Sequence, residues 1–126
     1  MVSNISNGVK IVVKTIYNEI NSSTNQHFFN YIINIENHND SEIKLIRRKW
    51  FVFDSLNHKF IVEGIGVIGE QPELNRGEIY TYTSGTELKG YFGEMFGYYQ
   101  FINIKTSQLF LVEIPKFKLE VPYSLN

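Results

Sequence analysis

The sequence predicts an all-β fold, and three observations support this. The 126-residue chain contains no alanine, the strongest helix former, whereas isoleucine and aromatic residues, which favour strands, are frequent. Apolar and polar residues alternate with period two in about seven segments, and no window shows helical periodicity. Turn-forming residues separate these segments. The pattern is typical of an immunoglobulin- or fibronectin III-like β-sandwich of about seven antiparallel strands, with a small closed barrel as the alternative.

Strands are expected in seven ranges, namely 9–17, 28–37, 42–54, 59–63, 77–83, 95–104 and 109–114. The third range changes phase, since Ile43 and Leu45 have one parity and Trp50 and Val52 have the other. Such a change predicts a β-bulge, with Trp50 as a core aromatic.

Two connections and the last strand carry further expectations. Residues 18–27 and 84–90 are rich in turn formers and are expected to be loops. Pro115 is expected to end the last ladder, after which Phe117 and Leu119 continue along an edge. The whole chain, residues 1–126, is expected to form a single domain with one core.

Composition sets limits on function. Twelve Lys and Arg against thirteen Asp and Glu give a formal charge of -1, which lacks the basic field of a nucleic-acid binder. There is no cysteine, so thiolate metal sites and disulfides are excluded. No targeting segment and no apolar run of membrane-spanning length is present. We therefore expect a cytoplasmic protein that binds neither nucleic acid nor a membrane.

The spacing Gly64-x-Gly66-x-x-Gly69, followed by Glu70 and Gln71, marks the candidate binding loop. A dinucleotide loop of this spacing opens a helix, but here two β-branched residues and a proline surround it, so a nucleotide site of that kind is not expected. Two interpretations stay open. The loop amides form a nest that binds phosphate or a nucleotide, or the glycines permit tight turns between strands.

The sequence offers no catalytic or metal constellation, and no cofactor is expected. His27, His38 and His58 are scattered among turns and are expected to be exposed, without ligand spacing. Ser84 lies in a turn-like segment without a nucleophile elbow. We expect a protein that is not an enzyme.

The candidate partner surface comprises Arg48, from the basic run 47–49, and Tyr98, from the aromatic cluster of residues 91–101. The arginines are expected on the solvated face of their strand. The outward half of the aromatic cluster is expected to bind an unidentified protein partner. Edge strands offer a second interface, and their pairing into a homodimer stays open.

Five motifs resemble the ApaG family, also called CorD, in order and spacing. They are Arg48-x-Trp50, Gly64-x-Gly66-Val67-x-Gly69-Glu70-Gln71-Pro72, Tyr82-Thr83-Ser84-Gly85, Gly93-x-Met95-x-Gly97-x-Tyr99-Gln100 and Val112-Glu113-Ile114-Pro115-x-Phe117. The resemblance implies a fibronectin III- or immunoglobulin-like sandwich and, in bacteria, a link to cobalt tolerance and magnesium efflux. Related eukaryotic domains are regarded as interaction modules. The resemblance therefore implies a non-enzymatic interaction domain, with the small-ligand protein as the alternative.

Overall fold

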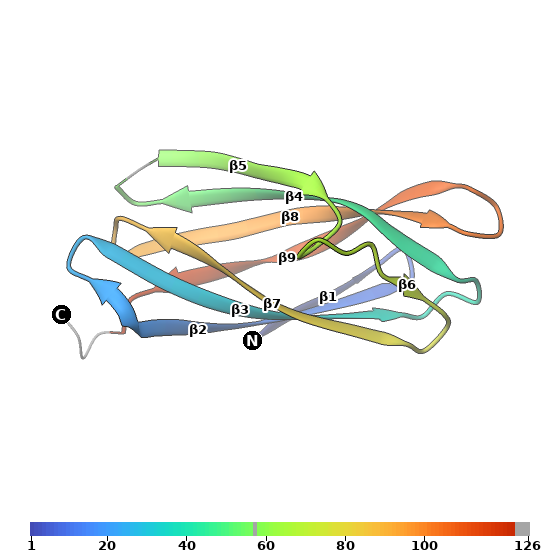
Figure 1. The fold of residues 1–126 in the computed structure, drawn as a ribbon, viewed down its shortest axis with the longest axis horizontal. Coiled ribbons are helices and arrows are strands. Elements are labelled where there is room, and N and C mark those ends of the chain that lie inside the picture. Colours follow the sequence, from blue (N-terminus) through green and yellow to red (C-terminus); the bar gives the residue numbers. More distant parts are fainter. Residues whose placement is uncertain (57, 123–126) are drawn as a thin grey trace.

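The chain folds into two antiparallel sheets that face each other (Figure 1). A computed structural model describes residues 1–56 and 58–122. The strands are β1 Val2–Ser6, β2 Val9–Ser23, β3 Gln26–Asn37, β4 Ile43–Asp54, β5 His58–Ile65, β6 Glu73–Leu74, β7 Ile79–Leu88, β8 Phe92–Asn103 and β9 Leu109–Glu120. Sheet A has the order β1-β2-β3-β7, and sheet B has the order β5-β4-β8-β9, with the short β6 paired to β4. The predicted sandwich is confirmed.

The core lies between the sheets and follows from the period-two pattern. In β3, every second residue from His27 to Asn37 is buried. In sheet B, Trp50 and Met95 face inward from neighbouring strands, and both are 2% exposed. The predicted core position of Trp50 is confirmed.

The described residues contain no helix that could span a membrane.

The predicted bulge in β4 is confirmed. The register of β4 against β8 shifts between Leu45 and Arg47, so Ile46 has no partner on β8. One extra residue reverses the side-chain parity, which explains why Leu45 and Trp50 both point into the core.

The expected end of the last ladder at Pro115 is wrong. Strand β9 continues to Glu120 because a second register shift places Pro115 and Lys116 opposite Phe96 alone. Proline cannot donate to a ladder, and the bulge accommodates it without ending the strand. Phe117 and Leu119 are consequently buried core residues.

Both expected loops are largely strand. Strand β7 extends through Ser84, Gly85 and Thr86, which pair with β3, so residues 84–88 belong to the sheet. Glycine suits this position, since an added Cβ at Gly85 would lie 3.0 Å from the carbonyl oxygen of Phe29. Within 18–27, β2 extends to residue 23 and β3 begins at residue 26.

Strand β1 was not expected from the pattern, although its hairpin has a clear signal. Asn7 and Gly8 join β1 to β2 with φ values of 47° and 75°, and Asn-Gly is the preferred pair for a two-residue turn of this kind. Polar groups of the same hairpin cover the outer edge of β9. The amide side chain of Asn7 donates to the carbonyl of Leu111 (2.6 Å), and the amide of Glu113 donates to the hydroxyl of Ser6 (2.8 Å).

Candidate functional site

The glycine loop begins where β5 runs beside β4. Gly64 pairs with Arg48, and an added Cβ at Gly64 would lie 3.0 Å from Nη1 of that arginine. The missing side chain leaves the space in which the guanidinium lies. Nη1 of Arg48 donates to the carbonyl oxygens of Ile65 (3.2 Å) and Gly66 (2.9 Å). The first glycine of the motif therefore makes room for Arg48, which in turn holds the start of the loop.

The bulge at Ile46 anchors the middle of the loop. Its carbonyl oxygen accepts the amide of Gly66 (2.8 Å) and the side-chain amide of Gln71 (3.1 Å). Gly66 has φ +64°, and a Cβ there would lie 2.1 Å from the carbonyl oxygen of Glu70. Only glycine satisfies both conditions.

A two-residue turn closes the loop between Val67 and Glu70. These two residues exchange backbone hydrogen bonds of 2.8 and 2.9 Å, and the central residues Ile68 and Gly69 have φ values of 48° and 73°. Positive φ at both positions defines a type I′ turn. The amides of Gly66, Val67 and Glu70 are thus donors within the chain, and this geometry favours the tight-turn interpretation over the anion nest.

The loop also links the two sheets. The hydroxyl of Tyr80, in β7 of sheet A, donates to the Glu70 carboxylate (2.8 Å), while Gln71 is bonded to Ile46 in sheet B. Three effects raise the pKa of the Tyr80 hydroxyl. The largest is its partial desolvation, and the smaller two are the hydrogen bond to Glu70 and the negative charge of Glu70. Consecutive residues of the loop therefore fasten opposite layers of the sandwich.

Beneath the loop lies a pocket of about 200 Å³ between the two sheets. Its walls combine one arginine, three hydroxyl-bearing side chains, an indole and apolar or glycine positions from the loop and its neighbours. The lining residues are Tyr31, Arg48, Trp50, Val62, Val67, Ile68, Gly69, Tyr82, Ser84 and Gly85.

Two buried tyrosines, Tyr31 and Tyr82, line the pocket, and a third, Tyr99, is bonded to Tyr82. Tyr82 and Tyr99 form a short hydroxyl–hydroxyl hydrogen bond. Burial raises the pKa of both hydroxyls, because the tyrosinate form would lose its hydration. Burial also raises the pKa of Tyr31, against the smaller lowering effects of the Ser84 hydroxyl and the Arg48 charge. These groups stay neutral at physiological pH and can act as hydrogen-bond donors.

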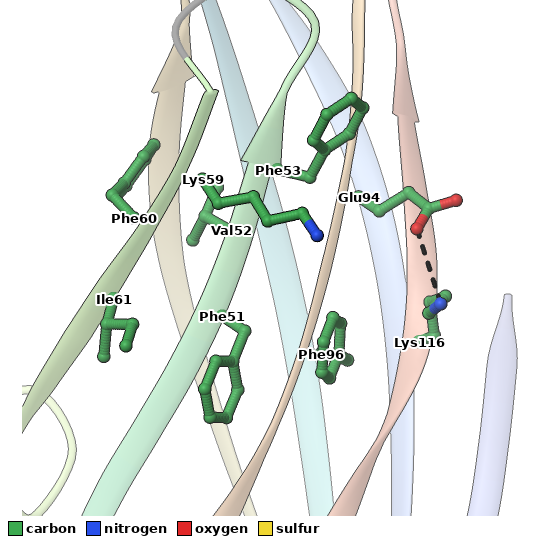
Figure 2. A pocket seen from close by; sticks show the side chains of 9 residues that line it. All are labelled: Phe51, Val52, Phe53, Lys59, Phe60, Ile61, Glu94, Phe96 and Lys116. Atoms are coloured by element: carbon green, nitrogen blue, oxygen red, sulfur yellow. Dashed lines mark ion pairs between the residues drawn. The ribbon is translucent and has the colours of Figure 1, made fainter.

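A second candidate surface covers the outer face of sheet B (Figure 2). A groove of about 610 Å³ is lined by Phe51, Val52, Phe53, Lys59, Phe60, Ile61, Glu94, Phe96 and Lys116. Figure 2 shows the rings of Phe51 and Phe96 side by side, and their centroids are 5.2 Å apart with nearly parallel planes. Lys116 lies 5.1 Å from the Phe96 ring centroid and pairs with Glu94 at 3.5 Å. We call this surface the aromatic groove.

The two members of the predicted partner surface lie on neighbouring strands and both line a pocket of about 200 Å³, although their side chains point to opposite faces of sheet B. Tyr98 is on the outer face, where its ring centroid is 6.5 Å from that of Phe51. Arg48 faces the sheet interior, where it lines the pocket under the glycine loop. The expectation that both arginines are solvated is right for the exposed Arg47 and wrong for Arg48, which shares the inward parity of Trp50.

The expectation of exposed loop histidines is wrong for His27 and confirmed for His38, which follows β3 and is exposed. His27 is 2% exposed in β3, where its Nδ1 is 3.2 Å from the Tyr17 hydroxyl and its Nε2 has no partner in the described part of the chain. His38 lies 3.3 Å from Glu36. The side chain of His58 falls outside the described residues. Within residues 1–56 and 58–122, no group of three or more His, Asp or Glu could hold a metal ion.

The tyrosines of the pocket and the role of Ile46 were not predicted from the sequence. A signal for Tyr31 and Tyr82 existed, since both have the inward parity of their strands. Ile46 could be located only by knowing which residue of β4 is the extra one, and the phase change alone leaves several choices.

The fold and these two sites define a class: an immunoglobulin-like sandwich of two antiparallel sheets, in which a glycine loop fastened to both layers closes a small arginine-lined pocket. A family model described as the ApaG domain matches residues 17–103. Protein ApaG of Vibrio cholerae is 41% identical over 120 residues, covering 94% of each chain, and Protein ApaG of Proteus mirabilis is 38% identical over 123 residues, covering 96% and 98%. The solved structure of a Bordetella pertussis protein described as ApaA superposes with a TM-score of 0.87 at 32% identity, covering 91% of this chain and 94% of that one. The chain belongs to the ApaG domain family.

Proposed function

We propose that this chain is a non-enzymatic protein-interaction domain and that the aromatic groove is its binding surface. The observation that supports this proposal is the exposure of large apolar side chains on the outer face of sheet B. Ile61 is 56% exposed, Phe92 54% and Phe96 39%. A contiguous apolar surface of this kind is typical of interaction sites, because water contact with it is unfavourable and a partner removes it.

The charges at the groove indicate the chemistry of the partner. Lys59 and Lys116 both line the groove, and Glu94, the one carboxylate among the described lining residues, is already paired with Lys116. Among the described ion pairs, none includes Lys59, whose side chain reaches across the groove in Figure 2. The partner is a protein segment that presents apolar side chains to Phe51 and Phe96 and a carboxylate to Lys59.

Affinity capture with three matched baits tests the proposal. The wild-type chain is compared with Phe96→Ser, which opens the groove, and with Ile16→Ser, which removes an apolar side chain of similar exposure (46%) from sheet A. Proteins retained by the wild type and by Ile16→Ser, and lost from Phe96→Ser, are expected. The affinity of each bound protein is then measured for the wild type and for a Lys59→Glu variant. The substitution should lower this affinity about tenfold.

Thermal melting first establishes that Phe96→Ser is folded, because cross-strand aromatic pairs also stabilise sheets. Equal retention by Phe96→Ser and wild type would contradict the proposal. A change in sedimentation with concentration, abolished by Phe96→Ser, would instead identify the occupant as a second copy of the chain and replace the proposed partner.

From the family resemblance, we further propose that the domain acts in the cytoplasm and influences cobalt tolerance and magnesium efflux through its partner. Under this proposal the domain does not hold the ion itself, and its melting temperature is unchanged by Co²⁺ or Mg²⁺. A rise in melting temperature that disappears when His38 and His58 are both changed to alanine would favour direct ion binding and overturn the indirect role.

The alternative function is phosphate or nucleotide binding by the amides of the Gly64–Gly69 loop. The internal hydrogen bonds of Gly66, Val67 and Glu70 weigh against it. Isothermal titration with pyrophosphate and ATP tests this alternative, and micromolar binding that is lost in a folded Gly69→Ala variant would support it.

A further inference from the structure

Arg48 carries a positive charge to the pocket between the sheets, and no described residue forms an ion pair with it. A guanidinium has five N–H donors, and the two bonds of Arg48 to backbone carbonyls both come from Nη1. Carbonyl oxygens orient the group but do not neutralise it. Partly buried cations are normally paired with an anion, because they have lost part of their hydration.

The other polar groups of the pocket are also donors. Tyr31 and Ser84 face each other across β3 and β7, and the hydrogen bond between their hydroxyls leaves one proton of the pair for a ligand. In the Tyr82–Tyr99 pair, one hydroxyl donates to the other, and the hydroxyl that accepts still has a proton to give. None of the ten lining residues is acidic. A pocket with one cation and several hydroxyl donors is complementary to an acceptor that carries negative charge.

Backbone strain lies at the mouth of the same pocket. Ile68, a lining residue, has φ 48°, a conformation that β-branched residues rarely adopt. It is also 59% exposed, so burial of its side chain does not account for the residue type. Strained backbone of this kind concentrates at sites that hold ligands.

We propose that this pocket is a binding site for a small oxyanion, either a phosphate or a carboxylate group, held by the free donors of Arg48 and by the hydroxyls of Tyr31 and Ser84. The volume of about 200 Å³ suits a single group of this size and is below the range of sites that enclose a drug-sized ligand. The site differs from a loop nest, because side chains from β3, β4 and β7 supply the donors. It also lies on the other side of sheet B from the aromatic groove.

Titration followed by amide chemical shifts tests the proposal, with inorganic phosphate, acetate and chloride as the three probes. Phosphate or acetate should shift the amides of Ile68 and Gly69 and the Nε resonance of Arg48, whereas chloride should leave them in place. Whichever of the two oxyanions binds more tightly identifies the chemistry of the natural ligand. No saturable shift with either oxyanion at tens of millimolar would overturn the proposal.

Two kinds of variant make the test specific. Arg48→Gln should weaken binding at least tenfold, on the order expected for loss of a charge-assisted pair, and Arg47→Gln removes the same charge from an exposed neighbour and should change nothing. Because Arg48 also holds the loop, two further variants, Ser84→Ala and Tyr31→Phe, remove a hydroxyl and retain the arginine. Each of them should weaken oxyanion binding severalfold. Unchanged binding in both hydroxyl variants, or equal losses in Arg47→Gln and Arg48→Gln, would overturn the proposal.

Discussion

The amide of Gly66 donates to the carbonyl oxygen of Ile46 across 2.8 Å, and this bond joins the second glycine of the loop to the bulge of β4. Ile46 has no partner on β8, so its carbonyl is available to the loop. The same oxygen accepts the Gln71 side chain at 3.1 Å. The bulge thus has two effects: it turns Arg48 inward, and it supplies the acceptor that holds the loop over that arginine.

Gly66→Ala should unfold the chain far more readily than Gly69→Ala. Both glycines have positive φ, which costs alanine about 1 kcal/mol. At Gly66 the new Cβ would also lie 2.1 Å from the Glu70 carbonyl oxygen, whereas at Gly69 nothing lies within 4 Å. Steric overlap adds to the conformational cost, so we expect a loss of about 3 kcal/mol or more for Gly66→Ala. Urea unfolding of the two variants measures the difference, and equal losses would show that the loop moves to accept the Cβ.

Ile68→Asn should stabilise the fold by about 1 kcal/mol, since asparagine tolerates positive φ and isoleucine does not. The chain contains its own reference for this substitution. Asn7–Gly8 has φ values of 47° and 75°, and Ile68–Gly69 has 48° and 73°. Ile68→Val, which keeps the branched Cβ, serves as the control and should show no gain in melting temperature. A lower melting temperature for Ile68→Asn would indicate that the isoleucine side chain stabilises the turn by contacts.

The strand positions and the bulge could be predicted because they depend on local alternation. Alternation places Trp50 inward whichever residue of β4 is the extra one in the bulge. The strands of both sheets were predicted from segments that alternate in this way. The errors arose where residue type and environment conflict. Ser84 and Gly85 have turn propensity but lie in a strand, where β3 needs a neighbour without a large side chain. Pro115 interrupts alternation in the same way, and only the pairing with β8 reveals that its strand continues.

The glycine loop of the candidate site could be predicted from the sequence, but the residues that the loop contacts could not. The G-x-G-x-x-G spacing marked a strained backbone correctly, since Gly66 and Gly69 have positive φ. The pairing of Gly64 with Arg48 depends on the register of β5 against β4, which the sequence leaves open. Strand parity also turns the side chains of Arg48 and Tyr98 to opposite faces of sheet B, although the register places these two residues on neighbouring strands, where both line one pocket.

Asp54→Ala should cost about 3 kcal/mol, because this carboxylate, 1% exposed, accepts three backbone amides. Oδ1 accepts from Leu56 (3.1 Å) and Gly90 (3.0 Å), and Oδ2 accepts from Lys89 (2.8 Å), so Asp54 ties the β4–β5 turn to the β7–β8 turn. The matched control is Asp40→Ala. Asp40 pairs with Arg76 at 3.0 Å but its side chain is 87% exposed, so its loss should change stability by less than about 1 kcal/mol. Comparable losses in the two variants, measured by urea unfolding, would contradict the structural role of Asp54.

The buried pair Tyr82–Tyr99 should make the fold sensitive to alkaline pH. Burial raises the pKa of both hydroxyls in the folded state, while in the unfolded chain they titrate near pH 10. A raised pKa means that the folded state retains protons that the unfolded state releases. The free energy of unfolding therefore keeps its full value below about pH 10 and falls as pH rises above it.

Tyrosinate absorbance and circular dichroism measured together at rising pH check this expectation. The buried tyrosines Tyr82 and Tyr99 should ionise only as the sheets unfold, so the last rise in tyrosinate absorbance should coincide with the loss of circular dichroism. A Tyr82→Phe, Tyr99→Phe double variant should unfold at higher pH, since the two groups that oppose ionisation are gone, whereas Tyr98→Phe, on the outer face of sheet B, should leave the midpoint unchanged. An identical alkaline midpoint in the double variant and the wild type would show that another group controls the transition.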